Sequence, residues 1–435
     1  MQTKIYFNKH DKRRNAILNN NLQATSTGRL ETTVYDIDIG RPAQGAIVRV
    51  ITVDSLGEQN VIEELITDEN GRTPVIELAA PPVDLSLSPG EQKPYAVYNI
   101  DVNLEGYQPV VIENAQILPN TTALQSVQIR PEIPEIPQVQ DIFVEDHTLY
   151  GVFPPKNPED PVKPLPPSLG FVVLPDPVVP EFVIVHEGIP TDTSARNVWV
   201  PFRNYIKNVA SCEIYSTWPQ ETIKANVLAI LSFTLNRIYT EWYRGKGFGF
   251  TITNSTAYDQ AFVYGRNIYD EISVIVDELF TTFITRPNIR QPLLTQYCDG
   301  SRTSCPDWMS QWGSKNLGTQ GYSAINILKN YYGQDIFLMQ ANKVSGVPSS
   351  FPGTSLQTGS TGAGVRTIQE QLNAISNNYP AIPKLAVDGI FGPNTRTAVT
   401  TFQRIFNLPQ TGVVDFATWY SISNIYVAVT RLAEP

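Results

Sequence analysis

The residue best suited to chemistry is a glutamate in an apolar setting. Glu213 is the single acidic residue between Tyr205 and Pro219. Removing a carboxyl group from water disfavours its charged form, so apolar neighbours would keep Glu213 protonated at neutral pH. A protonated carboxyl can donate its proton to the oxygen that leaves when a glycosidic bond breaks. An ordinary solvated glutamate is the alternative. The apolar neighbours are Val209, Cys212, Ile214, Tyr215 and Trp218.

Histidine and cysteine are sparse, and their pattern does not indicate a metal site. The histidines are His10, His147 and His186, and the cysteines are Cys212, Cys298 and Cys305. An odd number of cysteines does not indicate a disulfide framework. Without a nearby histidine, these three also make no convincing set of zinc ligands. We therefore expect no metal and no other cofactor.

Length and charge restrict the class of protein. A chain of 435 residues is too long for one ordinary core and suggests about two to four domains. The net charge of −10 and the pI near 5.0 argue against a nucleic-acid partner, whose phosphates attract a basic face. No run of about 18 apolar residues is present, so we expect no membrane span. Residues 1–15 are charged and lack the apolar stretch of a secretory signal.

The N-terminal third has the pattern of short β-strands. Residues 1–28 are polar and form a leader, and 29–130 contain apolar runs separated by turns. Runs at this spacing predict a β-sandwich. The expected strands include Leu30–Tyr35, Ala46–Val53 and Tyr95–Val102. The order of Asp36, Pro42, Ala46, the turn Thr67–Arg72 and Gly106-Tyr107 resembles the carboxypeptidase-regulatory or transthyretin-like sandwich. That resemblance implies a regulatory pro-region without a catalytic cluster.

Prolines mark the boundary of the next region. Residues 131–190 are dense in proline, which fixes φ and lacks an N–H. We therefore expect an extended, exposed spacer that joins no sheet interior and builds no long helix. Exposed linkers are where proteases cut, so an activating cleavage and a plain spacer both remain open. A second linker, rich in Ser, Gly and Thr, covers 345–362.

Between the linkers, residues 191–344 are aromatic and mainly helical. Apolar residues at helical spacing predict helices over Tyr205–Tyr215 and from Pro219 to Trp242, since proline suits a first helical turn. A further helix is expected over Asn267–Phe280, and a short strand over Thr251–Thr253. The whole chain is thus predicted to be a multidomain α+β protein.

The last region, 363–435, contains helices separated by glycine turns. Val365–Ile375 has a helical apolar stripe, and a second stripe contains Ala398, Val399, Phe402 and Ile405, with Asn394 or Thr395 as its cap. The turns are Asp388-Gly389, Gly392-Pro393-Asn394 and Thr411–Asp415, the last followed by a short helix at Thr418-Trp419. These motifs resemble the three-helix peptidoglycan-binding domain of cell-wall hydrolases, which implies a murein substrate. A helical adaptor with another role is the alternative.

The central region carries a second resemblance. Tyr205, Val209 and Glu213 are spaced four residues apart and are followed by Trp218-Pro219. Together with Thr251–Gln260 and Tyr264-Gly265, these residues resemble the core of the stage II sporulation protein D family. The resemblance implies that residues 191–344 are a catalytic domain that cleaves murein glycan as a lytic transglycosylase. It maps the catalytic acid onto Glu213.

In that mechanism one carboxyl group acts twice. It protonates the leaving oxygen and then takes the proton of the C6 hydroxyl, which attacks C1 of muramic acid, so no partner carboxylate is needed. Neighbours must position the substrate. The residues expected to do so are Tyr297, Asp299, Gln260, Asp259 and Trp218. The alternative is that they pack, turn the chain or hold the fold. The loop Tyr297–Cys305 departs from the family pattern, which puts the substrate contacts in doubt more than Glu213.

The four regions together resemble the clostridial spore-cortex-lytic enzymes. That resemblance implies a proenzyme stored in the spore, in the cortex or the coat-cortex region, with cortex peptidoglycan bearing muramic δ-lactam as substrate. It also implies a subtilisin-like germination protease as the activating partner. Packaging during sporulation would account for the expected lack of a secretory signal.

Three other functions remain open. The chain could be a non-catalytic murein-binding enhancer of another hydrolase, or a hydrolytic muramidase that uses Asp259 or Asp299 with a water. A phage or conjugation lysin is the third. Product ends, and activity on walls without δ-lactam, distinguish these classes.

Overall fold

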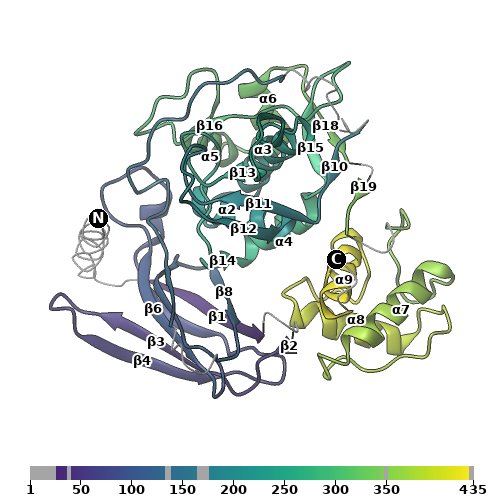
Figure 1. Ribbon diagram of the computed structural model, residues 1–435. Coiled ribbons are helices and arrows are strands. Elements are labelled where there is room, and N and C mark those ends of the chain that lie inside the picture. The colour runs from purple at the N-terminus through teal and green to yellow at the C-terminus, as the bar shows by residue number, and fades with distance from the viewer. Residues whose placement is uncertain are drawn as a thin grey trace. The chain divides into compact units, whose positions relative to one another are not determined.

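The computed structural model describes residues 26–36, 41–132, 139–163, 176–341, 343–346 and 351–430 (Figure 1). Most of the leader and parts of both linkers lie outside the described residues. The chain divides into two compact units. The first runs to Asp146 and adds 264–270 and 378–381, and the second comprises 147–263, 271–377 and the residues from 382 onward. The fold is mixed α+β, with strands in the N-terminal region and helices in the C-terminal one.

The described residues of the first unit form two five-stranded sheets. One contains β1 (Ser26–Asp36), β2 (Arg41–Pro42), β5 (Ile76–Ala80), β8 (Thr122–Ile129) and β14 (Ile268–Tyr269). The other has the order β4 (Gln59–Ile66), β3 (Ile47–Val53), β6 (Ala96–Asn103), β7 (Val110–Ile117), β9 (Gln140–Phe143), and η1 (Val83–Ser86) lies between β5 and β6 in the chain. Strand β1 is parallel to β8. Alternate side chains of β6 are buried, because successive strand residues point to opposite faces.

The described residues of the proline-rich region match only in part the exposed spacer that its composition predicts. Strand β9 forms a sheet edge beside β7, and β10 (Val178–Val179) and β11 (Phe182–His186) lie within the same region. Val144 and His147 are each only 1% exposed. Proline is tolerated at edges and in extended segments, so the residues between the prolines remain free to pair and pack.

Helix α3 (Gln220–Tyr239) is the core of the second unit. It is buried nearly all round, and it packs against α2 (Phe202–Glu213), α5 (Gln311–Thr319), α6 (Ala324–Tyr332) and β15 (Thr282–Thr285) (Figure 1). The helices predicted from Tyr205 and from Pro219 are therefore confirmed, each with a proline immediately before its first residue.

The second unit also contains short, paired strands. Strand β11 pairs with β12 (Asn197–Pro201) and β13 (Ile252–Thr253). The other pairs are β15 with β18 (Phe337–Gln340), β16 (Tyr297–Cys298) with β17 (Met309–Ser310), and β10 with β19 (Lys343–Val344). The remaining elements are η2 (Arg244–Lys246) and α4 (Asp270–Leu279). The helix predicted from Asn267 begins only at Asp270, because Ile268 and Tyr269 pair with β8 instead.

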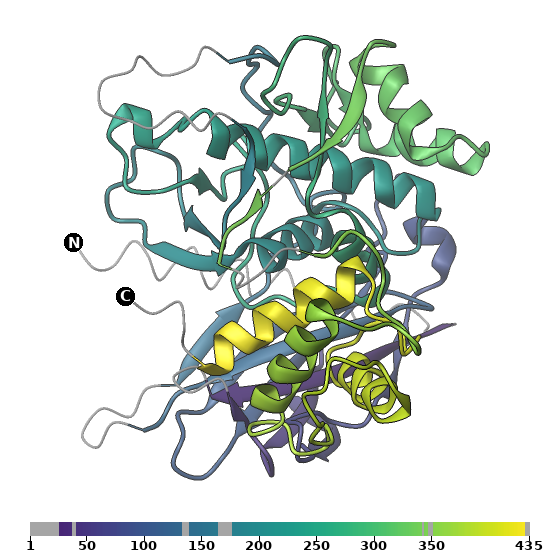
Figure 2. The ribbon, with the colours of Figure 1, turned by 90° about the vertical axis from the view of Figure 1, so that its right-hand side faces the viewer.

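The C-terminal helices are α7 (Ala363–Ile375), α8 (Pro393–Ile405) and α9 (Phe416–Thr430), and α9 lies beside α7 (Figure 2). Helix α8 begins at Pro393 after Gly392, so the predicted cap at Asn394 or Thr395 is wrong. The predicted short closing helix is also wrong. Helix α9 has 15 residues, because the apolar residues that follow Trp419 continue its buried face.

Two buried glutamines hold the turns of this region in the same way. Gln369 Oε1 accepts the N–H of Gly389 at 2.8 Å, and its Nε2 donates to the carbonyl of Ile390. Gln403 makes the equivalent pair with Gly412 at 2.9 Å and with Val413. Both glycines have positive φ, which a residue without Cβ adopts readily. Each glutamine therefore supplies the partners that its turn lacks.

We predict that Gln369→Leu lowers the free energy of unfolding of this region by about 1–3 kcal/mol, because it leaves the buried N–H of Gly389 without a partner. Peptidoglycan binding should weaken with it. Thermal unfolding and a pull-down with insoluble peptidoglycan measure both effects. The control is Gln410→Leu at an exposed position. Equal melting temperatures for the two variants would contradict the assignment.

Candidate active site

Glu213 is the last residue of α2, and its side chain is withdrawn from solvent. The residue is 3% exposed. Its Oε1 accepts the backbone N–H of Ala261 at 2.7 Å. Its Oε2 is buried and, among the described residues, has no well-formed hydrogen bond. A carboxylate at a helix C-terminus also faces the negative end of the helix dipole. Burial and the helix dipole both favour the protonated form of Glu213.

The environment raises the pKa of Glu213 to about 7, and burial is the main cause. The positive charge of Lys156, the nearby hydroxyl of Tyr297 and the Ala261 amide act in the opposite direction. A group with a pKa near 7 holds its proton about half the time at neutral pH. It can therefore donate a proton in one step and accept one in the next.

Gln260 connects the groups around Glu213. Its Nε2 donates to the hydroxyl of Tyr297 at 3.1 Å, and its Oε1 accepts from the hydroxyls of Tyr205 at 3.2 Å and Thr234 at 2.8 Å. Gln260 is fully buried, and Tyr297 is 3% exposed. In this structure Gln260 thus fixes the two tyrosines. A substrate contact by either residue stays a prediction.

Asp259 is fully buried, and both of its oxygens are used within the protein. Oδ1 accepts from Arg237 Nε at 2.7 Å. Oδ2 accepts from the Tyr243 hydroxyl at 2.6 Å and from the N–H and hydroxyl of Thr253. These bonds hold the loop that carries Ala261, whose N–H reaches Glu213. The geometry gives Asp259 a positioning role.

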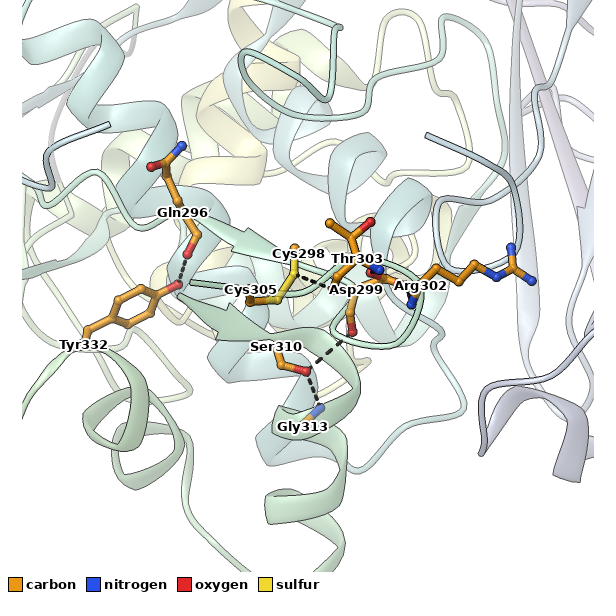
Figure 3. Close-up of a disulfide and its surroundings, with 9 residues drawn as sticks. All are labelled: Gln296, Cys298, Asp299, Arg302, Thr303, Cys305, Ser310, Gly313 and Tyr332. Carbon is orange, nitrogen blue, oxygen red and sulfur yellow. Dashed lines mark hydrogen bonds between the residues drawn. A yellow bond between two sulfur atoms is a disulfide. The ribbon is translucent and has the colours of Figure 1, made fainter. Parts of the chain in front are cut away.

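Asp299 stabilises a loop closed by a disulfide. Its carboxylate accepts the backbone N–H groups of Arg302 at 2.7 Å and Thr303 at 2.8 Å. Figure 3 shows this loop and the Cys298–Cys305 bond next to it. The cysteine count did not predict this bond, because an odd number still allows one pair. Cys212 is buried, and its thiol donates to Asn208 Oδ1 at 3.5 Å.

An aromatic cluster packs beside the end of α2. Trp218 is 3% exposed. The centre of its ring lies 5.0 Å from the ring centre of Trp312 and 5.9 Å from that of Tyr215. Gln311 donates to the backbone carbonyl of Glu213 at 3.1 Å. Trp218 therefore packs in the core here. Trp312 and Gln311 were not identified from the sequence, since no spacing relates them to Glu213.

Lys156 is the least expected residue at the site. It comes from the proline-rich region, yet its ammonium group donates to the carbonyl of Asp259 and lies 5.1 Å from the ring centres of Phe233 and Tyr297. Burial lowers the pKa of Lys156, and the negative charges of Glu213 and Asp259 oppose that shift. Nothing in the sequence around Lys156 indicates this position.

The two described histidines pack against aromatic rings. The ring of His147 packs on Tyr215, and that of His186 stacks on Phe250; His10 is outside the described residues. Within the described ranges, no group of three or more His, Cys, Asp or Glu residues is placed to hold a metal ion. Across the same ranges, no helix has the length and apolar character needed to cross a bilayer.

Residues 361–422 match the family described as "Putative peptidoglycan binding domain". The match covers α7, α8 and the first half of α9. It confirms the predicted peptidoglycan-binding domain at the C-terminus and identifies peptidoglycan as a partner of this region.

Other comparisons add little. No curated protein matches the chain. The Bacillus anthracis TIE protein is 19% identical over 24% of this chain and 18% of its own, with a TM-score of 0.17. Catechol 1,2-dioxygenase from Acinetobacter sp. ADP1 is 15% identical over 29% and 61%, with a TM-score of 0.19. Klebsiella pneumoniae 5-hydroxyisourate hydrolase is 17% identical over 24% and 85%, with a TM-score of 0.16. The chain covers less than two thirds of the first two structures, and these TM-scores carry no argument.

The raised pKa predicts how stability depends on pH. A carboxyl whose pKa rises from 4.5 to about 7 on folding stabilises the fold fully below pH 4.5, and this contribution is lost as the pH rises through 7. Relative to Glu213→Gln, the wild-type chain should lose about 3 kcal/mol of unfolding free energy over this window. Urea unfolding at several pH values measures it. Glu278→Gln, at an exposed position, is the control, and a pH-independent difference for Glu213→Gln would contradict the raised pKa.

Proposed function

We propose that this protein cleaves the glycan strands of peptidoglycan as a lytic transglycosylase, with Glu213 as its acid and base. The observation that carries the proposal is a buried carboxyl group with a pKa near 7, in a chain whose C-terminal residues match a peptidoglycan-binding family. The binding domain would hold the enzyme on the wall while the central region acts on the strand.

The reaction balances with one carboxyl group. Protonated Glu213 gives its proton to the glycosidic oxygen, and the bond from that oxygen to C1 of muramic acid breaks. The carboxylate then accepts the proton of the C6 hydroxyl as O6 bonds to C1, which closes a 1,6-anhydro ring. Glu213 ends protonated, and no water is consumed.

The surroundings of Glu213 favour this reaction over hydrolysis. A hydrolytic muramidase needs a second carboxylate for the water or the intermediate. Both oxygens of Asp259 are already bonded to Arg237, Tyr243 and Thr253. The carboxylate of Asp299 accepts the N–H groups of its own turn. Both carboxylates thus have structural roles in this structure.

The finer proposal follows from the resemblance to clostridial spore-cortex-lytic enzymes, and to the enzyme SleC in particular. In it the chain is a proenzyme of the spore cortex or coat-cortex region. A subtilisin-like protease cuts it between 131 and 190 during germination, and its substrate is cortex peptidoglycan with muramic δ-lactam. The β-rich pro-region, the catalytic domain and the binding domain would then act in sequence.

A non-catalytic enhancer of another hydrolase is the second candidate. It is favoured by one observation: Glu213 is only 3% exposed. On that hypothesis Glu213 is a buried structural acid, and substituting it leaves glycan cleavage unchanged.

Products distinguish these candidates. We expect the full chain, after limited proteolysis between 131 and 190, to release fragments of spore cortex that end in anhydromuramic acid. Glu213→Gln should release at least about 100-fold less, because the proton donor is lost, whereas Glu278→Gln should match the wild type. Mass spectrometry of the fragments is the measurement.

Three outcomes would count against the proposal. Reducing ends would indicate a hydrolase. Full activity of Glu213→Gln would remove Glu213 from the chemistry. If no form releases fragments from cortex that a known lytic enzyme degrades, the enhancer remains.

A further inference from the structure

Residues 147–163, here named the strap, lie against the end of α2 that carries Glu213. The N–H and the hydroxyl of Thr148 both donate to the carbonyl of Cys212 at 3.1 Å. The ring Nε2 of His147 lies 3.3 Å from the carbonyl of Ile214. The strap is thus bonded to the residues immediately before and after Glu213.

The middle of the strap reaches the candidate catalytic position. The ammonium group of Lys156 donates to the carbonyl of Asp259 and lies 5.1 Å from the ring centres of both Phe233 and Tyr297. It interacts electrostatically with Glu213. A lysine side chain therefore fills space next to the carboxyl group that the proposed reaction needs.

The strap is held at several further points. Asn157 donates its N–H to the carbonyl of Ala257 at 2.7 Å, and Gln296 bonds to the backbone of Asn157 and Glu159. At the far end, Gln291 exchanges two hydrogen bonds of 3.0 Å with the backbone of Lys163. The carboxylate of Glu159 pairs with Arg237. These contacts cross the region from α2 to the segment before β16.

The strap opposes the proposed chemistry in two ways. It is bonded to the residues on both sides of Glu213, which is 3% exposed, so it would stand in the way of a glycan strand at this position. A nearby positive charge also stabilises the carboxylate, whereas the first step needs the protonated acid. Prolines at 154, 155, 158 and 161 favour an extended chain, a shape comparable to that of a glycan strand.

We propose that the strap is an internal inhibitor that occupies the glycan-binding groove, with Lys156 at the catalytic position. This inference rests on the proposed function and adds its regulation. It also assigns the productive cut. A cut between Lys163 and Asp176 separates the strap from the rest of the catalytic region, whereas a cut between Glu132 and Val139 leaves it attached.

Two cleavage sites in the full chain test the assignment. A site-specific protease sequence is placed in 164–175 in one variant and in 133–138 in the other. After complete cleavage, release of cortex fragments should rise at least about tenfold over the intact chain in the first variant and stay near the intact level in the second. Equal activation by both cuts, or no activation by the first when a cut elsewhere does activate, would overturn the proposal.

Lys156→Met in the intact full chain is the second test, because methionine keeps the length of the side chain and removes its charge. It should raise activity about tenfold, with Lys343→Met, at an exposed position, as the matched control. A thermal melt confirms folding. If Lys156→Met instead lowers activity in both intact and cut chains, Lys156 belongs to the catalytic machinery and the strap is not an inhibitor.

Binding separates this inference from the proposed reaction. In the Glu213→Gln background, calorimetry with a tetrasaccharide of alternating N-acetylglucosamine and N-acetylmuramic acid should show about tenfold tighter binding once Lys156→Met is added. Such a gain without cleavage by any form would disprove the reaction and keep the strap as a cover of a glycan site. No gain in binding would overturn the strap proposal whatever the activity.

Discussion

Placing a carboxyl group at the C-terminal end of a buried helix costs free energy twice, because water is lost and the helix dipole opposes a negative charge. Glu213 meets both conditions, and one amide, that of Ala261, is its direct hydrogen-bond donor. The surrounding region is organised around this group. Gln260 holds the two tyrosines beside it, and Asp259 holds the loop that supplies the amide. Much of the polar network thus positions one acid.

Arg237 links that network to the strap. Its side chain is fully buried between the carboxylates of Asp259 and Glu159, which come from the loop and from the strap respectively. Removing one partner from a buried charge is costly, because the remaining charge has lost its water as well. Arg237 therefore ties the position of the strap to the loop that bonds Glu213. The same guanidinium would need water or a substrate group in place of Glu159 once the strap leaves.

Local sequence patterns predict the helices and the C-terminal domain. The stripes from Tyr205 and from Val365 predict α2 and α7, and the glycines at 389 and 412 mark turns with positive φ. The apolar run around Glu213 also predicts its burial. Lys156 could not be found this way, because its position depends on contacts with residues about a hundred positions away in the chain. The disulfide and the strand at Ile268 depend on pairing between residues that are apart in the chain. Composition and periodicity do not predict such pairing.

The proposed reaction uses one carboxyl group and no water. Cleavage of cortex by the cut chain in water enriched in oxygen-18, followed by mass spectrometry of the new muramic acid ends, distinguishes it from hydrolysis. We expect anhydro ends that contain no oxygen-18, because O6 of the same sugar forms the new bond. Reducing ends that carry one atom of oxygen-18 would contradict it, since water would then be the nucleophile.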